Sequence, residues 1–374
     1  MSLYYSSPEK LSRDEMKALA ADVVRLSKLL TRDREALPAA YLKDEGLRKA
    51  YRTYFLPSNS GKIHIPLKDL SLSPKKPLAR EKLRILDLGS GPGTSVLGVM
   101  EFFARNELRP ELDFIAVDHV AENLRETEAL FGACRPELYP DATLKTIRTS
   151  VEQMHMEGWF DLIILSNLMN ELFHVDGDRT AKRVAFMKSV LGRFLAHDGS
   201  CIIIEPALRE TSRGMLEVRD GLLEHGYTVY SPCLGSDSCP VLADPRDWCH
   251  EDLPWDPPAL IKELDRLVGL RKDSLKFSYL VLRKDGLSLA DIQDKNAFRI
   301  VSEPLVSRGK KEFYICGHGL RKLVTRLDKD TTSLNGPFEN LKRGEVAAFE
   351  GLMDEGKRFK VTKETRVITA AVAS

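Results

Sequence analysis

The sequence lacks long apolar runs and any strong excess of charge of one sign. No stretch of the 374 residues approaches the roughly 18 uncharged apolar residues of a membrane span, which excludes a protein anchored by helical spans. The opening residues, MSLYYSSPEK, contain neither an apolar signal region nor an Arg-rich amphipathic stretch, so we expect a cytoplasmic, bacterial protein. With 43% hydrophobic and 30% charged residues, the composition predicts one large domain with smaller additions.

Cysteine is scarce, with six residues in the whole chain, which excludes the disulfide framework of a small secreted protein. Cysteines in a long chain without a signal peptide are more often thiols or metal ligands. Three of the six lie close together and a fourth lies downstream in the tail, whereas Cys134 and Cys201 are isolated. We expect the two isolated residues to be buried, unliganded thiols.

The net charge of +1 hides an asymmetry between the tail and the rest of the chain. From Phe298 onward there are 15 Lys and Arg against 10 Asp and Glu, a local charge of +5. The densest cations are Arg308, Lys310, Lys311, Arg321, Lys322 and Arg326. They predict a surface that faces phosphates, although an ordinary solvated basic face has the same pattern.

Three parts follow one another along the chain. Residues 1–78 form a helical section, because apolar residues such as Met16, Leu19 and Val23 recur at helical spacing after a capping residue, Ser12 or Asp14. Residues 79–297 alternate short apolar strands with helical stretches, which predicts an α/β domain with a mostly parallel sheet. The expected strands are LRILDL, LDFIAVD, TLKTIRT, FDLIILS, SCIIIEP, YTVY and KFSYLVLRK.

Two further features complete this organisation. The connection at about 231–275, between the last two of these strands, is too long for a turn and is rich in proline, so we expect a folded insertion that carries cysteines. Residues 298–374 contain short strand-like runs with glycine-bearing turns, which predict a small basic β-rich domain. The runs are RIVSEPLV, KEFYIC, EVAAFEG and KVTKETRVITAAV.

The most specific motif is LDLGSGPG, where the first expected strand runs directly into a glycine-rich loop and then a helix. Its glycines are Gly89, Gly91 and Gly93. Glycines let the backbone turn sharply and approach a ligand without a Cβ clash. Asp87 precedes them, and Asp118 ends the next strand, where a carboxylate can accept hydrogen bonds from a ribose diol. The motif therefore predicts a site for an adenosyl cofactor in a Rossmann-like core.

The glycine spacing favours S-adenosylmethionine over NAD. A dinucleotide enzyme places a helix N-terminus against pyrophosphate with G-x-G-x-x-G spacing, and here the third glycine comes one residue early. The form acid-x-Gly-x-Gly-x-Gly resembles motif I of class I methyltransferases, in which Asp87 would lie near the cationic methionine portion.

The loop after the fourth strand, SNLMNEL, lies where methyltransferases place groups beside the reactive methyl. Asn167 could contact the methionine portion, or Ser166 and Asn167 could simply cap a helix. The loop lacks the Pro-Pro-aromatic element of exocyclic-amine methyltransferases, and no cysteine nucleophile follows strand four or five. Methyl transfer from a sulfonium mostly requires positioning, so these deficits leave the catalytic residues unassigned.

The expected insertion contains SPCLGSDSCPVLADPRDWCHED, and the tail contains FYICGHG. The candidate ligands are Cys233, Cys239, Cys249 and Cys316. Four thiolates on turn-rich loops can hold a tetrahedral zinc ion or a four-iron cluster, and the spacing matches neither a zinc ribbon nor a ferredoxin. His250 and His318 are neighbours that could support or replace a ligand, although ordinary surface histidines have the same pattern.

Together these motifs resemble the small-ribosomal-subunit methyltransferase-like proteins, whose mitochondrial members act in assembling the small subunit. The resemblance covers nearly the whole chain, from LPAAYL and AYRTYFLP through LDLGSGPG, SNLMNEL and PCLGSDSCP to RIVSEPLVSRGKKEFYICGHG. It implies a class I methyltransferase fold, S-adenosylmethionine at the motif I residues, a 4Fe-4S cluster on the four cysteines, and association with small-subunit rRNA.

Two functions follow from this resemblance. The chain could methylate small-subunit rRNA, or it could be a non-catalytic assembly factor that retains the cofactor fold and presents its basic tail to RNA phosphates. We expect a monomer.

Overall fold

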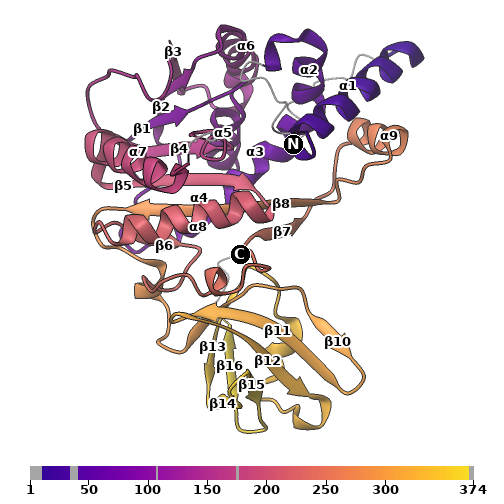
Figure 1. The fold of residues 1–374 in the computed structure, drawn as a ribbon, viewed down its shortest axis with the longest axis vertical. Coiled ribbons are helices and arrows are strands. Elements are labelled where there is room, and N and C mark those ends of the chain that lie inside the picture. The colour runs from indigo at the N-terminus through magenta and orange to yellow at the C-terminus, as the bar shows by residue number, and fades with distance from the viewer. Residues whose placement is uncertain (1–10, 34–40, 107, 174–176, 370–374) are drawn as a thin grey trace.

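A computed structural model describes residues 11–33, 41–106, 108–173 and 177–369 (Figure 1). It contains an N-terminal helical section, a central α/β domain and a C-terminal β-rich domain, which follow one another along the chain as the sequence predicts. Among the described residues, no helix has both the length and the apolar character needed to cross a bilayer.

The N-terminal section is helical because its apolar residues form one stripe. Its helices are α1 (Arg13–Thr31), α2 (Glu45–Ala50), α3 (Leu56–Ser60) and α4 (His64–Ser71). The amide of Glu15 donates to Ser12 Oγ at 3.3 Å, and the amide of Ser12 donates to Glu15 Oε2 at 2.8 Å. This capping box confirms Ser12 as the start of the first helix. A short π-helical turn, Tyr51–Phe55, joins α2 to α3.

The central sheet has the strand order β3-β2-β1-β4-β5-β8-β6. β7 also pairs with β8, along its first residues, whereas β6 pairs with its last residues. The strands are β1 (Lys82–Leu88), β2 (Glu111–Asp118), β3 (Thr143–Arg148), β4 (Phe160–Ser166), β5 (Leu195–Pro206), β6 (Thr228–Ser231), β7 (Glu251–Pro254) and β8 (Ser274–Arg283). All seven strands expected from the sequence are present. β1 to β5 pair in parallel, and β8 runs antiparallel to its neighbours β5, β6 and β7.

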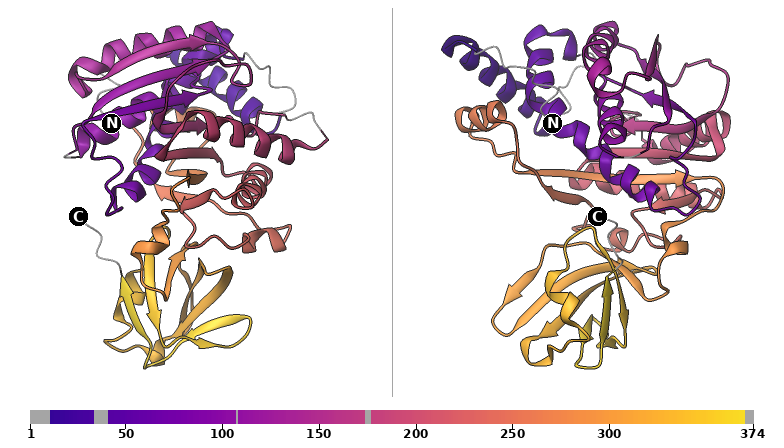
Figure 2. Two further views of the ribbon diagram at one scale, coloured as in Figure 1. Left: turned by 90° about the vertical axis from the view of Figure 1, so that its left-hand side faces the viewer. Right: turned by 180° about the vertical axis from the view of Figure 1, so that it is seen from behind.

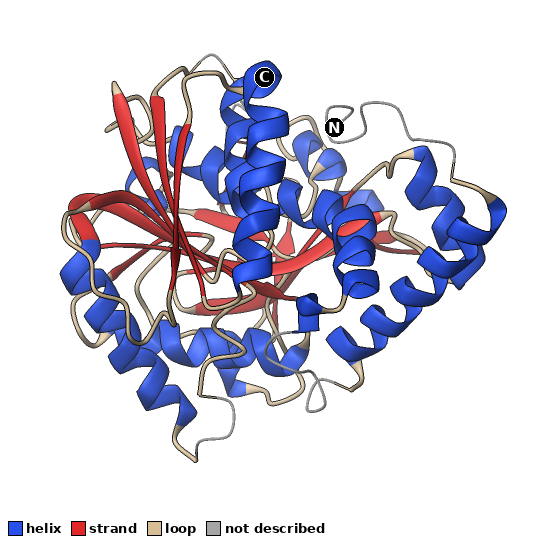
Figure 3. Cartoon of the chain, turned by 90° about the horizontal axis from the view of Figure 1, so that it is seen from above, coloured by secondary structure: helices blue, strands red, loops and turns tan. Residues whose placement is uncertain are grey.

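Helices cover both faces of this sheet (Figure 3). They are α5 (Thr94–Arg105), α6 (Ala121–Leu138), α7 (Arg179–Phe194) and α8 (Arg209–Leu223). Successive residues of β1 point to opposite faces, so Ile85 packs in one apolar cluster with Phe103 and Leu86 packs in another with Met187. This is the doubly covered α/β domain that the strand-helix alternation predicts. The order of the parallel strands reverses at β1, since β2 and β3 lie on one side of it and β4 and β5 on the other. The carboxyl ends of β1 and β4 therefore form the edge at which ligands bind in such sheets.

The connection between β6 and β8 is a folded insertion. It contains a 3-10 turn (Pro240–Ala243), the strand β7 and the helix α9 (Ala259–Val268). Ile261 and Leu264 of α9 pack with Val23 and Leu26 of α1, so the insertion also contacts the N-terminal helices. The sequence analysis did not foresee β7 or α9, because a strand of four residues and a short helix give weak patterns.

The C-terminal domain is a second, curled sheet with the order β14-β15-β12-β11-β9-β13-β16 and β10 paired to β11. Its strands are β9 (Ala297–Ile300), β10 (Leu305–Ser307), β11 (Lys310–Gly317), β12 (Leu320–Leu327), β13 (Val346–Glu350), β14 (Met353–Asp354), β15 (Arg358–Val361) and β16 (Arg366–Thr369). Phe298, Phe313, Phe338 and Phe349 fill its interior. Residues of the insertion run between this domain and the core (Figure 2).

Candidate cofactor and metal sites

The glycine-rich loop follows β1 at the ligand-binding edge of the sheet. All three glycines have positive φ, of +65° at Gly89, +55° at Gly91 and +81° at Gly93. A Cβ on Gly89 or Gly93 would meet Leu168 or Thr127, each at 2.8 Å, whereas no atom lies within 4 Å of the corresponding position at Gly91. The loop is therefore packed at its ends and open at its middle, where a ligand can approach the backbone.

Asp87 is a buried carboxylate at the end of β1. Only 1% of the residue is exposed, and neither carboxylate oxygen has a hydrogen-bond partner among the described residues. Burial raises the pKa of Asp87 to about 7, although the nearby hydroxyls of Ser90 and Ser95 act to lower it; the charge of Asp118 adds a smaller upward contribution. A buried acid without donors is unfavourable, so this position fits a cationic or hydrogen-bond-donating ligand.

Asp118, at the end of β2, holds the glycine loop in place. One of its oxygens accepts from the amide of Gly91 at 2.9 Å, and the other accepts from the amide of Val120 at 2.8 Å and from Asn123 Nδ2 at 3.2 Å. The structure thus gives Asp118 a loop-shaping role that the sequence analysis did not include. Its predicted contact with a ribose stays a prediction.

Asn167 directly follows β4 and lies beside the glycine loop, since its neighbour Leu168 packs against Gly89. It has a φ of +58°, and its amide donates to the carbonyl of Ile204 at 2.7 Å. No helix starts at this point: turns follow, and α7 is capped instead by Asp178. The helix-capping interpretation of Ser166 and Asn167 is therefore wrong, because the chain turns back toward the sheet.

The rest of the SNLMNEL loop is tied to the core. Asn170 Nδ2 donates to Glu205 Oε2 at 2.5 Å, and Glu205 is 1% exposed at the end of β5. Burial raises the pKa of Glu205 to about 7. Arg183 of α7 donates to the carbonyls of Asn170 and Leu172 at 3.1 and 3.0 Å. The sequence analysis missed this network, because its members come from three separate elements.

Residues of the N-terminal section approach the same edge of the sheet. Tyr51 lies in the π-helical turn, and its hydroxyl is 3.2 Å from Thr94 Oγ1 at the start of α5. Burial, with neighbouring Tyr51, Glu171 and Asp118, raises the pKa of Tyr41 well above its usual value. The N-terminal helices therefore form part of the wall around the glycine loop, a role that their aromatic residues, visible in AYRTYFLP, could have suggested.

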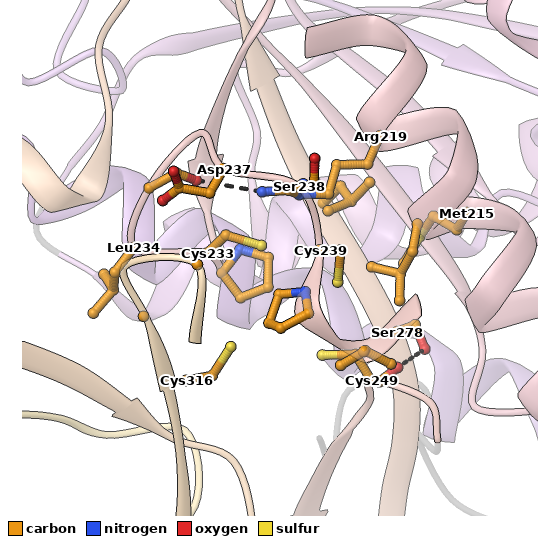
Figure 4. A pocket seen from close by; sticks show the side chains of 18 of the residues that line it. Met215, Arg219, Cys233, Leu234, Asp237, Ser238, Cys239, Cys249, Ser278 and Cys316 are labelled. Atoms are coloured by element: carbon orange, nitrogen blue, oxygen red, sulfur yellow. Dashed lines mark hydrogen bonds between the residues drawn. The ribbon is translucent and has the colours of Figure 1, made fainter. Parts of the chain in front are cut away.

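The four candidate cysteines line one cavity (Figure 4). Cys233 follows β6, Cys239 precedes the 3-10 turn, Cys249 precedes β7 and Cys316 lies on β11. All four are free thiols. The structure therefore brings together the residues that the sequence analysis selected, although they come from two domains.

Neighbouring elements hold the cysteine loops. The amide of Cys239 donates to Asp220 Oδ2 of α8 at 3.0 Å. The carbonyl of Cys249 accepts from the hydroxyls of Ser212 and Ser278, at 2.5 and 2.7 Å. Hydrogen bonds from α8 and β8 therefore fix two of the loops before any ligand binds.

Two buried arginines lie close to the cysteines. Arg219 is 2% exposed and lines the cavity, while Arg299 is 5% exposed and pairs on the same face of the second sheet with Cys316. The Nε atom of each has no hydrogen-bond partner among the described residues. Burial raises the pKa of Cys239 to about 11 and that of Cys316 to about 12. Buried guanidinium groups with unused N–H donors fit an anionic, thiolate-bound group in this cavity.

The spacing of these side chains sets one limit. Within the described ranges, no three His, Cys, Asp or Glu side chains are arranged closely enough to hold a single metal ion. The assignment of the four cysteines as metal ligands is a prediction supported by their common cavity.

The basic segment that was expected to face phosphates is largely ion-paired. Its ion pairs are Lys310 with Glu312, Lys311 and Arg326 with Glu339, Arg321 with Asp247, and Lys322 with Asp354. Five of the six cations that the sequence analysis grouped together are thus ion-paired, and they share four acids. Glu312 lies on the same strand as Lys310, whereas the other three acids are distant in sequence from their partners. These pairs reduce the net charge of the segment, and its expected role as a phosphate-facing surface stays a prediction.

Comparisons with known proteins give one family match and a set of distant structural matches. A family model described as mitochondrial small ribosomal subunit Rsm22 matches residues 73–364. A methyltransferase from Pyrococcus furiosus is 12% identical over 59% of this chain and 81% of its own, with a TM-score of 0.33. A precorrin-6y C5,15-methyltransferase from Geobacter metallireducens is 12% identical over 60% of this chain and 87% of its own, with a TM-score of 0.34. No curated protein matches the chain.

Proposed function

The chain belongs to the Rsm22 family, and from that membership we propose that it is an S-adenosylmethionine-binding assembly factor of the small ribosomal subunit that carries a metal cluster. The observation that carries this proposal is the convergence of four cysteines from two domains on one cavity beside two buried arginines.

S-adenosylmethionine, which supplies an activated methyl group when bound, would occupy the edge formed by β1, β2 and β4. Asp87 would face the cationic methionine portion, because its buried carboxylate lacks donors. Gly89, Gly91 and Gly93 would let the backbone approach the cofactor. Asp118 would reach the ribose, and Asn167 would contact the methionine portion. These six residues are the proposed cofactor-binding set.

A 4Fe-4S cluster would be held by Cys233, Cys239, Cys249 and Cys316, with a zinc ion as the alternative. The group would join the β-rich domain to the insertion, because Cys316 lies in one and the other three cysteines lie in the other. Metal binding would then stabilise the contact between the two parts. The buried arginines would offset the negative charge of the thiolates.

A structural role for the cofactor pocket is favoured by the SNLMNEL loop. In methyltransferases this loop presents groups to the acceptor, whereas here the amide of Asn170 is bound to buried Glu205. Methylation of rRNA is the second candidate function, and the open backbone at Gly91 beside Asp87 favours it.

The metal proposal is tested by purifying the protein without oxygen. Broad absorption at about 400 nm with roughly four irons per chain is expected for a cluster. A colourless protein with about one zinc ion would replace the cluster with a structural zinc site. A protein that contains neither metal would refute the proposal.

The choice between assembly factor and enzyme is tested with small subunits from a strain that lacks this protein. Purified protein and labelled S-adenosylmethionine are added under conditions in which cofactor binding is verified. We expect the protein to associate with the subunits without labelling RNA or protein. Label in the rRNA would establish the enzyme, and failure to associate with the subunits would refute the ribosomal role.

A further inference from the structure

A second cavity, of about 230 Å³, shares Cys249, His250 and Cys316 with the cysteine cavity and adds Asp247, Trp248, Arg321 and Arg343 to its lining. Trp248 and His250 come from the insertion, whereas Arg321 and Arg343 come from the β-rich domain. The cavity therefore lies where the two parts meet.

Three nitrogen atoms around this cavity have no partner. Trp248 Nε1, His250 Nδ1 and Arg343 Nε are buried, and none has a hydrogen-bond partner in the described part of the chain. Leaving one buried polar group unsatisfied costs about 1–3 kcal/mol, so three around one cavity point to a ligand rich in acceptors. Arg343 Nη2 donates to the carbonyl of His250 at 2.5 Å, which fixes the guanidinium group against the insertion.

The charge of the cavity is positive. Arg321 is offset by Asp247, which also lines the cavity. Arg343 has no carboxylate within 4.0 Å among the described residues. The charge of Glu251 acts on Arg343 from beyond this distance, and Glu251 Oε1 lies 3.5 Å from Arg299 Nε. Arg343 therefore retains a charge available to an anion, in contrast to the paired cations of β11 and β12.

The cavity also has an aromatic wall. The rings of Trp248 and His250 are stacked, with centroids 5.6 Å apart and planes inclined by 17°. Cationic donors beside a stacked aromatic pair match the two parts of a nucleotide, because the donors bind the phosphate and the rings pack against the base.

We propose that this cavity binds a phosphate group of single-stranded RNA, with Arg343, Trp248 and His250 as the donors. The proposal rests on the proposed ribosomal role, because the small subunit would supply the RNA. The RNA contact would then lie directly against the cysteine site, rather than on the basic strands that the sequence suggested.

The test measures the affinity of full-length protein for a short fluorescent oligouridylate. The variants are Arg343→Met, Arg343→Lys and Trp248→Phe, all purified without oxygen and compared at equal metal content. Arg308→Met is the matched control, because Arg308 is an exposed cation of the same domain that does not line the cavity.

We expect Arg343→Met to weaken RNA binding by about tenfold or more, as for the loss of a hydrogen bond from a charged donor. For this variant, the slope of the logarithm of the binding constant against the logarithm of the salt concentration should decrease in magnitude by about 0.7, the value for one phosphate contact to a single strand. Trp248→Phe keeps an aromatic ring at this position, although a smaller one, and loses the indole N–H, so a smaller loss of about fivefold is expected. Arg343→Lys should recover part of the affinity, and Arg308→Met should change it by less than about twofold.

Equal losses in Arg343→Met and Arg308→Met would overturn the proposal, because they would indicate general electrostatic attraction. Wild-type affinity in both Arg343→Met and Trp248→Phe would also overturn it. Inorganic phosphate and uridine monophosphate are tested as separate probes, and binding of these without RNA binding would overturn the RNA assignment. Association with small subunits is measured in parallel: if it persists without oligouridylate binding, this inference fails alone, and if it is absent, the proposed function fails.

Discussion

The glycine-loop pocket and the cysteine cavity contain buried groups of opposite charge. The oxygens of Asp87 accept no hydrogen bond among the described residues, whereas Arg219 Nε donates none even though Arg219 is paired with Asp220. The first arrangement fits a cation and the second fits an anion. The two sites also differ in origin, because a single strand-loop-helix unit forms the glycine loop while two domains must meet to form the cavity. In both sites, buried polar atoms without hydrogen bonds indicate the charge of the expected ligand, although the backbone motifs differ completely.

The largest expected effect is that of Cys233→Ser, which should abolish metal binding. Loss of the bound group would weaken the contact between the insertion and the β-rich domain, and RNA affinity should fall with it. S-adenosylmethionine binding should change by less than about twofold, because the cysteine cavity and the glycine loop share no lining residue. Metal content, RNA affinity and cofactor affinity are measured on the same preparation.

Cys201→Ser is the control, because Cys201 is a buried thiol outside the cavity. Unchanged RNA binding by a verified metal-free variant would break the link between metal and RNA.

Arg219→Met tests the charge of the cysteine cavity. Reduction of a cluster adds negative charge, which a buried guanidinium group stabilises, so its removal should lower the midpoint potential. A tenfold change in the equilibrium corresponds to about 60 mV for one electron, and we expect a shift of at least this size. Redox titration followed by absorption measures it. Arg246→Met is the control, since Arg246 is an exposed cation of the same insertion paired with Asp244. Equal potentials in the two variants would remove Arg219 from the site.

The pH dependence of cofactor binding tests the opposite charge at Asp87. Its pKa of about 7 means that the carboxylate is mostly protonated at lower pH and must ionise to bind a cation. The affinity for S-adenosylmethionine should therefore fall by about tenfold between about pH 8 and about pH 6. The raised pKa affects folding stability in the opposite direction when no cofactor is added. Protonation of Asp87 then raises the free energy of unfolding, and this stabilisation is lost as pH rises through about 7. Calorimetric titration should show that Asp87→Asn binds more weakly and without this pH dependence. A wild-type protein whose affinity does not change over this range would contradict the assignment.

The smallest expected effect concerns the backbone of the glycine loop. Gly93→Ala forces a Cβ into the left-handed region and to within 2.8 Å of Thr127, so it should lower the free energy of unfolding by about 1–3 kcal/mol. Gly132→Ala lies within α6 with no atom within 4 Å of the new Cβ, and it should raise stability by about 1 kcal/mol. Denaturant titration of both variants checks the pair. Equal behaviour of the two would show that the loop conformation is not constrained.

The sequence predicted the fold well where a pattern is local. Strand-helix alternation gave every strand from β1 to β6, as well as β8, and of the two capping candidates, Ser12 and Asp14, the structure shows Ser12 at the start of α1. β12 was missed, because its lysines and arginines were interpreted as a solvated surface. In the folded chain those cations alternate with residues such as Val324 and pair with acids that are distant in sequence or on neighbouring strands. Charge counted along a chain does not include such partners, so the sequence alone overstates the free positive charge of this segment.

By itself, the sequence determined the glycine loop and the choice of candidate cysteines, because both depend on residue types at short or recognisable spacing. Only the tertiary structure brought Cys316 to the insertion and placed Arg219 and Arg299 beside the thiols. It likewise decided that Asn170 binds Glu205 and that Arg343 meets Trp248. Burial and hydrogen-bond pairing between distant segments decide which polar groups remain unsatisfied, and those properties arise only when the whole chain has folded.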